Sequence, residues 1–123
     1  MDPEDRATSL ASHLIHALAI VGVHTWGRRE HGITRVLSIA RHVGRLLQPL
    51  TPAQAAVAAS QLRAGSCLTR SIAISARLPG SEVVIGVRRG LQPEAFSAHA
   101  WVEHNGVPIR RSDPEGLEIT RLA

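Results

Sequence analysis

The hydrophobic pattern of this chain changes once, at Pro79-Gly80. Before this point, apolar residues recur every three or four positions, which is the spacing of amphipathic helices. After it come short runs rich in Val and Ile that end at turn residues, as strands do. Helices followed by strands predict an α+β fold, with N-terminal helices ahead of a small antiparallel sheet. The 123 residues are enough for one domain with a buried core, and we expect residues 1–123 to form it.

Four helices are predicted before the change of pattern. The first begins at Pro3 or Ser9 and ends near Val23. Its apolar residues recur at helical spacing and should make it a core helix: Leu10, Leu14, Ile15, Leu18 and Val21. The second covers about 33–47 and is closed by Pro49.

The third and fourth helices carry capping signals. Thr51 can cap the third helix, Pro52 suits its first turn, and Gln54 completes a capping box. Gly65 should stop this helix. Ser66 is the expected N-cap of the fourth helix, which holds the only cysteine of the chain and ends at Pro79-Gly80.

Three strands are predicted after the fourth helix, over 82–89, 98–104 and 107–113. Asn105-Gly106 is a strong hairpin signal between the last two, and Pro108 places the last strand at an edge. Residues 1–64 should therefore be mainly helical, and residues 65–123 should hold the cysteine helix and the antiparallel strands.

Charge and composition narrow the class of partner. The net charge is +4, and all fourteen basic residues are Arg. Ten acidic residues are interspersed, and the three aromatic residues are too few for a base-stacking platform, so nucleic acid is not the expected partner. The single cysteine cannot form an internal disulfide, which suits the cytoplasm. The apolar stretch 14–23 is too short to span a bilayer, so no membrane anchor is expected.

Cys67 is the first candidate for chemistry, because it stands at the predicted start of the fourth helix. The N–H groups and partial positive charge of a helix N-terminus favour a thiolate over a thiol. The same N–H groups can stabilise an oxyanion on a substrate carbonyl. The alternative is that Cys67 is a small buried hydrophobic residue.

His99 is the candidate base. It lies in "SAHAWVE", on a strand that follows the cysteine helix, and this order is the layout of papain-like thiol enzymes. Of the other histidines, His13 and His16 share a helix face, but without a third ligand they predict no metal site. We expect them to be ordinary helix residues.

The third member of such a site is an Asp or Asn on the neighbouring strand, and Asp113 is the only Asp across the turn. A three-residue connection, Asn105 to Val107, would pair His104 with Pro108 and so His99 with Asp113. Tighter turns would place Ser112 or Arg111 opposite His99 instead.

Three blocks of sequence, in order, resemble one family: "CLTRSIAISARLPG", "VVIGVRR" and "FSAHAWVEHNGVPI". They are similar to the lasso-peptide leader peptidases, the transglutaminase-like cysteine proteases of lasso-peptide biosynthesis, over residues 63–113. The resemblance implies a transglutaminase/papain-like fold and a Cys-His-Asp triad that removes the leader from a ribosomally made precursor. Cys67 would be the nucleophile, His99 the base and Asp113 the acid. The family pattern has its acid where this chain has Arg111, two residues before Asp113.

The resemblance also implies partners. It is to the stand-alone form of these enzymes, which works with a separate leader-recognition protein and ahead of a lasso cyclase. No cofactor or metal is implied. Two alternatives stay open: a non-catalytic module of the same fold that binds the precursor peptide, for which Arg111 speaks, and another thiol acyltransferase with the same triad.

Overall fold

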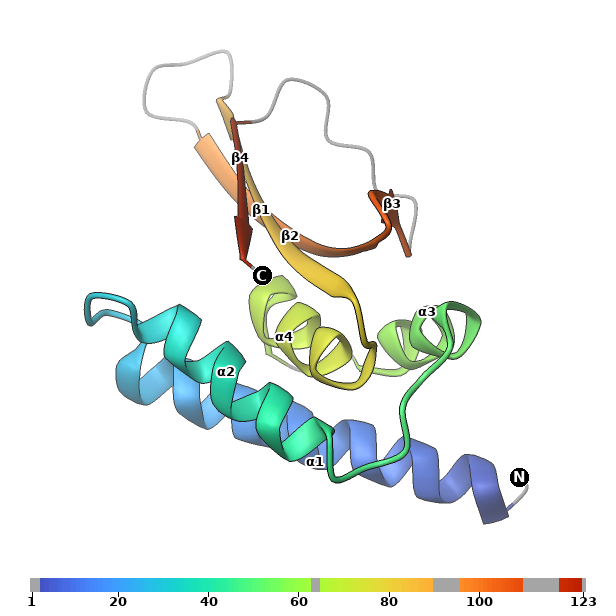
Figure 1. The fold of residues 1–123 in the computed structure, drawn as a ribbon. Helices are drawn as coiled ribbons and strands as arrows, with labels where there is room; N and C mark the ends of the chain where they lie inside the picture. The colour runs from blue at the N-terminus through green and yellow to red at the C-terminus, as the bar shows by residue number, and fades with distance from the viewer. Residues whose placement is uncertain (1–2, 63–64, 90–95, 110–117, 123) are drawn as a thin grey trace.

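The computed structural model describes residues 3–62, 65–89, 96–109 and 118–122 (Figure 1). Within them, helices precede an antiparallel sheet, so the predicted α+β fold is confirmed. The helices are α1 Pro3–Trp26, α2 Gly32–Gly44, α3 Pro52–Gln61 and α4 Cys67–Arg77. The strands are β1 Ser81–Arg89, β2 Phe96–His104, β3 Val107–Pro108 and β4 Glu118–Leu122.

Helix α4 lies at the centre of the fold. Figure 1 shows α1 and α2 side by side as an outer layer, with α4 between this layer and the sheet. Eight of its residues, Thr69 and Ser71–Arg77, are buried. Its polar side chains form hydrogen bonds inside the protein, as burial requires. Ser71, for example, donates its hydroxyl to the Cys67 carbonyl at 2.7 Å.

Helix α1 forms as predicted, but only part of its predicted core stripe is buried. Leu10, Leu14 and Val21 are each more than 60 % exposed, although the apolar spacing predicted a core stripe. The buried face combines Ile15 of that stripe with small or polar residues: Ser12, His16, Ala19 and Gly22. Small residues are required on this face because α2 packs very close to α1. A Cβ added to Gly22 would lie 2.9 Å from Cγ1 of Val36.

The ends of α2 and α3 also differ from the predictions. Helix α2 ends at Gly44, where an added Cβ would overlap the carbonyl oxygen of Ala76 on α4. Helix α3 ends at Gln61, not at Gly65. Gly65 instead adopts a left-handed backbone, with φ of 72°, in the connection to α4. The capping box of α3, Thr51 with Gln54, forms as predicted.

The sheet has the strand order β3-β2-β1-β4 and is antiparallel throughout. Val83 on β1 faces both Val102 on β2 and Leu122 on β4, and these three side chains pack in or against the core. The edge position of Pro108 is as predicted. Strand β4, at the other edge, was not anticipated.

The hairpin between β2 and β3 corrects one expectation. His104 pairs with Val107 and Glu103 with Pro108, so the connection has two residues and not three. Asn105 and Gly106 have φ of 55° and 79°. Left-handed values at both central residues are those of the two-residue turn that matches strand twist best, and Asn-Gly is its preferred sequence. The pairing of His104 with Pro108, on which the predicted register of Asp113 depended, is therefore wrong.

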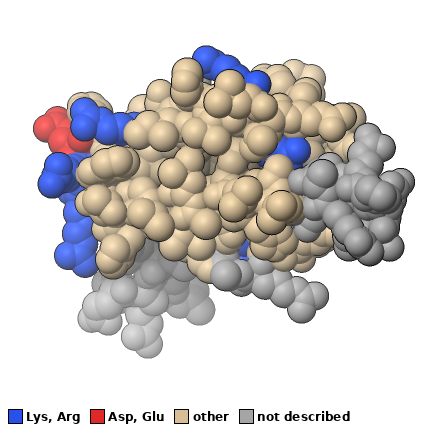
Figure 2. Space-filling view, turned by 90° about the horizontal axis from the view of Figure 1, so that it is seen from below, with Lys and Arg blue, Asp and Glu red and all other residues tan. Residues whose placement is uncertain are grey.

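Two general properties of the described residues bear on possible partners: the distribution of charge on the surface and the hydropathy of the helices. On the face seen in Figure 2, most of the arginines lie towards the rim and the middle carries little charge. Among the helices of the described residues, none combines the length and hydropathy needed to cross a membrane.

Candidate functional site

Cys67 is the first residue of α4, and Ser66 is its N-cap, as predicted. The Ser66 hydroxyl accepts a hydrogen bond from the Thr69 N–H at 3.2 Å, and the Thr69 hydroxyl accepts one from the Ser66 N–H at 3.0 Å. This is a capping box with Thr in the place usually held by Glu or Gln. The Arg70 N–H is bound to the Ser66 carbonyl. The helix itself cannot satisfy the N–H groups of Cys67 and Leu68, which lie in its first turn.

The Cys67 sulfur contacts strand β2. The Ala100 N–H donates a hydrogen bond to Sγ of Cys67 at 3.3 Å, across 33 residues of sequence. A donor that points at the sulfur stabilises negative charge on it. Cys67 is half-buried, so its sulfur is neither fully sequestered in the core nor fully open to solvent. A small core hydrophobe would be more deeply buried and would need no polar contact.

This contact places Cys67 at the outer edge of β2. The Ile109 N–H binds the Val102 carbonyl, so Val102 directs its backbone groups towards the β3 side. Backbone direction alternates along an antiparallel strand, so Ala100 directs its N–H to the same side. Described residues of β3 pair only as far as Glu103. At Ala100 the backbone N–H on this side is directed at Cys67.

His99 immediately precedes Ala100, so the peptide unit that touches Cys67 belongs to both residues. Side chains alternate between the faces of a strand. The side chains of Val102 and Ala100 point to the face of the sheet that packs on α4. The His99 ring therefore lies on the opposite face of the sheet. There it stacks on Trp101, with ring centroids 6.0 Å apart and planes at 26°. The structure thus joins Cys67 to the backbone at His99, at the edge between the two faces.

The ring that supports His99 is itself fixed. Nε1 of Trp101 donates to Oε2 of Glu103 at 2.8 Å, and Nη1 of Arg121 donates to Oε1 at 2.6 Å. Burial alone would raise the pKa of Glu103, but the hydrogen bonds from Arg121 and Trp101 and the Arg121 charge together lower it. Glu103 is therefore an anion that holds the Trp101 indole. The "AHAWVE" block supplies this whole arrangement except Arg121, which comes from β4.

His16 is a supporting residue that sequence reasoning missed. It comes from α1, is 3 % exposed, and places Nε2 3.1 Å from the Thr69 hydroxyl oxygen. That hydroxyl donates to the Ser66 carbonyl at 3.0 Å, so Nε2 is the donor to it. Burial, followed by the charges of Arg70 and His13, lowers the pKa of His16 and keeps it neutral.

Gly65 completes the support for the start of α4. A Cβ at this position would lie 2.6 Å from the Thr69 hydroxyl oxygen and 3.1 Å from Nε2 of His16. The backbone of the connection therefore lies directly over the His16–Thr69 hydrogen bond and leaves no room for a side chain. The only sequence signal for this contact was a polar residue on the small-residue face of α1.

The arrangement of a cysteine helix against an antiparallel sheet lies within a region that matches a known protein family. The model of the transglutaminase-like superfamily matches residues 11–122, which is most of the chain. The chain belongs to the transglutaminase-like superfamily. No curated protein and no solved structure gives a significant match. The superfamily generally includes cysteine proteases and transglutaminases, both of which act through a thiol on acyl groups.

The transglutaminase-like match covers Cys67 and His99 as well as the N-terminal helices from residue 11. Asp113, the predicted acid, lies within the matched range but outside the described residues. Within the described residues, no three His, Cys, Asp or Glu side chains gather closely enough to hold a metal ion. The start of α4 brings together a thiol and helix N–H donors, and the sulfur contacts the residue next to His99, whose imidazole completes a set of groups used for acyl transfer.

Proposed function

We propose that the protein is a cysteine peptidase that removes the leader from a ribosomally synthesised lasso-peptide precursor through an acyl-enzyme intermediate. The observation that carries the proposal is the contact of Cys67 Sγ, at the first residue of α4, with Ala100 N, the residue after His99. The superfamily match supports thiol-dependent acyl chemistry. The three motif blocks around Cys67 and His99 support the lasso-peptide substrate.

In the proposed reaction, His99 takes the proton of the Cys67 thiol and the sulfur attacks the carbonyl carbon of the scissile peptide bond. The N–H of Cys67 stabilises the negative charge that develops on the carbonyl oxygen. His99 then gives its proton to the leaving amine, which departs as the C–N bond breaks. Water, activated by His99, hydrolyses the thioester and restores the thiol. Asp113 is proposed to orient His99.

This chemistry requires the His99 imidazole to reach Cys67 Sγ around the outer edge of β2. The stack on Trp101 restricts the ring to one side of the strand. The hydrogen bond from the Ala100 N–H holds the sulfur at that edge. Trp101 is on this view a positioning residue, and Cys67 and His99 are the catalytic residues.

The proposed partners follow from the same substrate. A separate leader-recognition protein would present the precursor, and a lasso cyclase would act on the released core peptide. The proposed setting is the cytoplasm, where a lone cysteine stays reduced.

Two other functions use the same residues. A thiol acyltransferase would form the same thioester and resolve it with an amine in place of water. A non-catalytic precursor-binding module would keep the fold and use no thiolate. Arg111, where the family pattern has its acid, favours this second alternative.

The test is leader release from the precursor, followed by mass spectrometry, with the leader-recognition protein present. We expect Cys67→Ala to abolish release while circular dichroism shows an unchanged fold. Cleavage that persists in this variant would refute the proposal. If neither variant nor native protein cleaves, alkylation of Cys67 decides: reactivity no higher than that of free cysteine favours the binding module.

A further inference from the structure

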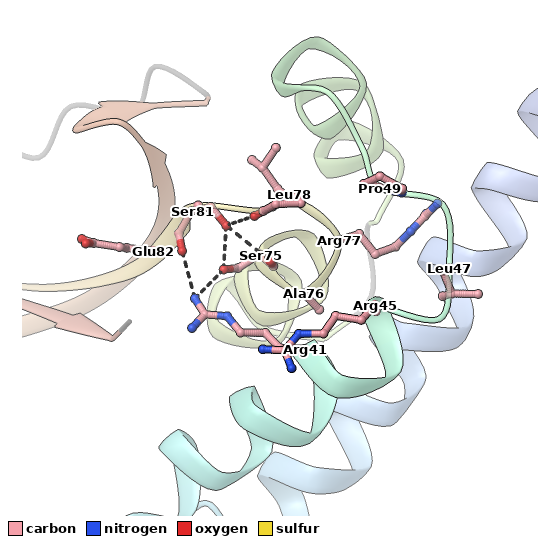
Figure 3. Close-up of a pocket in the computed structure, with 13 residues that line it drawn as sticks. Arg41, Arg45, Leu47, Pro49, Ser75, Ala76, Arg77, Leu78, Ser81 and Glu82 are labelled. Atoms are coloured by element: carbon pink, nitrogen blue, oxygen red, sulfur yellow. Dashed lines mark hydrogen bonds between the residues drawn. The ribbon is translucent and has the colours of Figure 1, made fainter.

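A pocket of about 600 Å³ lies at the end of α4 opposite Cys67 (Figure 3). The ends of α2 and α4, the segment that follows α2 and the start of β1 meet there. Its polar wall carries Arg41, Arg45 and Arg77, and its apolar wall includes Leu47, Pro49 and Leu78. An α-helix rises about 1.5 Å per residue, so the length of α4 puts roughly 15 Å between this pocket and Cys67.

Arg41 is held in place at the pocket. Its Nη2 donates to the Ser75 hydroxyl and to the Ser81 carbonyl, both at 3.0 Å. The two serine hydroxyls are 2.8 Å apart, and the Ser81 hydroxyl donates to the Leu78 carbonyl at 2.7 Å. Figure 3 shows this chain of hydrogen bonds behind the guanidinium. A guanidinium that is already fixed loses little freedom when it binds an anion with its other N–H groups.

The pocket has more positive charge than its own residues balance. Arg45 lies one helical turn after Arg41. Burial, followed by the Arg45 charge, lowers the pKa of Arg41, and the charge of Glu82 offsets this only in part. The one acidic lining residue is Glu82, and it is paired with Arg121 at 3.4 Å. Figure 3 shows its side chain pointing away from Arg41. Among the described residues, no carboxylate lies within 4.0 Å of either guanidinium.

Helix dipoles do not remove this surplus. The C-terminal ends of α2 and α4 both lie at the pocket, and each carries about half a negative charge. Two helix ends therefore offset roughly one of the two positive charges of Arg41 and Arg45. A positive charge remains beside an apolar wall, in a volume within the range of ligand sites.

We propose that this pocket binds a peptide through an acidic side chain, with the carboxylate on Arg41 and Arg45 and a neighbouring aliphatic side chain on Leu47 and Pro49. Paired arginines favour a carboxylate because their planar forks match its two oxygens. The apolar wall requires a ligand with an apolar body, which a free inorganic anion lacks. The site is separate from Cys67, and it does not depend on the peptidase proposal.

The experiment is an NMR titration of the full chain with acetyl-Leu-Glu-amide, read at the amides of Gly44 and Gly80, which line the pocket. Two comparison ligands are titrated in the same way. Acetyl-Leu-Gln-amide lacks the negative charge, and inorganic phosphate lacks the apolar side chain. We expect the Glu peptide to bind at least ten-fold more tightly than either. Arg45→Gln should weaken it about ten-fold, whereas Cys67→Ala should leave it unchanged.

Arg35→Gln is the matched control, because Arg35 is an exposed arginine of the same helix outside the pocket. Equal weakening by Arg35→Gln would show a general charge effect and overturn the proposal. Equal binding of the Gln peptide, tighter binding of phosphate, or no shift at Gly44 and Gly80 would each overturn it as well. In these cases Arg41 and Arg45 only stabilise the negative C-terminal ends of α2 and α4.

Discussion

The Thr69 hydroxyl links the start of α4 to the Ser66 backbone and to His16 on α1. The substitution Thr69→Val tests how much these hydrogen bonds stabilise the protein. Valine keeps the shape of threonine but removes the hydroxyl. The change deletes three hydrogen bonds, to the Ser66 N–H, the Ser66 carbonyl and Nε2 of His16. Thr69 is 4 % exposed, so water cannot simply replace the lost oxygen.

The expected cost combines two effects. Loss of the capping contact at the exposed Ser66 destabilises the protein by about 1 kcal/mol. His16, which is 3 % exposed, is left with a buried donor that has no acceptor, at a cost of about 1–3 kcal/mol. We therefore expect Thr69→Val to lower the free energy of unfolding by about 2–4 kcal/mol.

The assay is urea unfolding at neutral pH, with Thr51→Val as the matched control. Thr51 caps α3 in the same kind of box but is exposed and touches no buried histidine. Its change should cost only about 1 kcal/mol. A double variant that adds His16→Leu should recover part of the loss, because both partners are then apolar. Equal costs for Thr69→Val and Thr51→Val would refute the role given to His16.

Two further predictions concern pH and the outer face of the sheet. The pKa of His16 is lowered from its usual 6.5, so the unfolded chain binds a proton that the folded chain does not. Unfolding free energy should therefore fall as pH drops below about 6.5, by at most about 1.4 kcal/mol per pH unit from this group. His16→Gln should remove this part of the slope in urea titrations, and an unchanged slope would contradict it. Trp101→Phe keeps a ring beside His99 but leaves Oε2 of Glu103 without its donor. We expect the unfolding free energy to fall by about 1–3 kcal/mol and leader release to become slower at unchanged KM. If both the unfolding free energy and the release rate stay the same, the role given to Glu103 in holding Trp101 is wrong.

Local signals in the sequence were enough to predict the elements that carry the site. The helical spacing, Ser66 as N-cap and the capping box of α3 were predicted and are confirmed, since each depends on residues close in sequence. The change from helices to strands at Pro79-Gly80 also agrees with the structure. Cys67 at a helix start followed from the same signals.

Long-range packing could not be read from spacing. In the predicted apolar stripe of α1, Ile15 is buried as expected, but Leu10, Leu14 and Val21 are exposed. The close approach of α2 at Gly22 selects small residues over large ones. His16 was taken for an ordinary helix residue, since its partner Thr69 is 53 residues away. The register at Asn105-Gly106 depends on one residue of turn length. The sequence left tighter turns open beside the three-residue connection that would align Asp113 with His99, and the structure has a two-residue turn.

The burial of α4 on all sides limits how the protein can be modified. Thr69 and Ser71–Arg77 are buried among α1, α2, α3 and the sheet, and polar side chains of the helix form hydrogen bonds with Ser12, Gln48 and Arg41. Substitutions along this helix disturb several contacts at once, as expected in a closely packed interior. A library aimed at new specificity should therefore leave α4 fixed and vary the strand edges and the pocket rim.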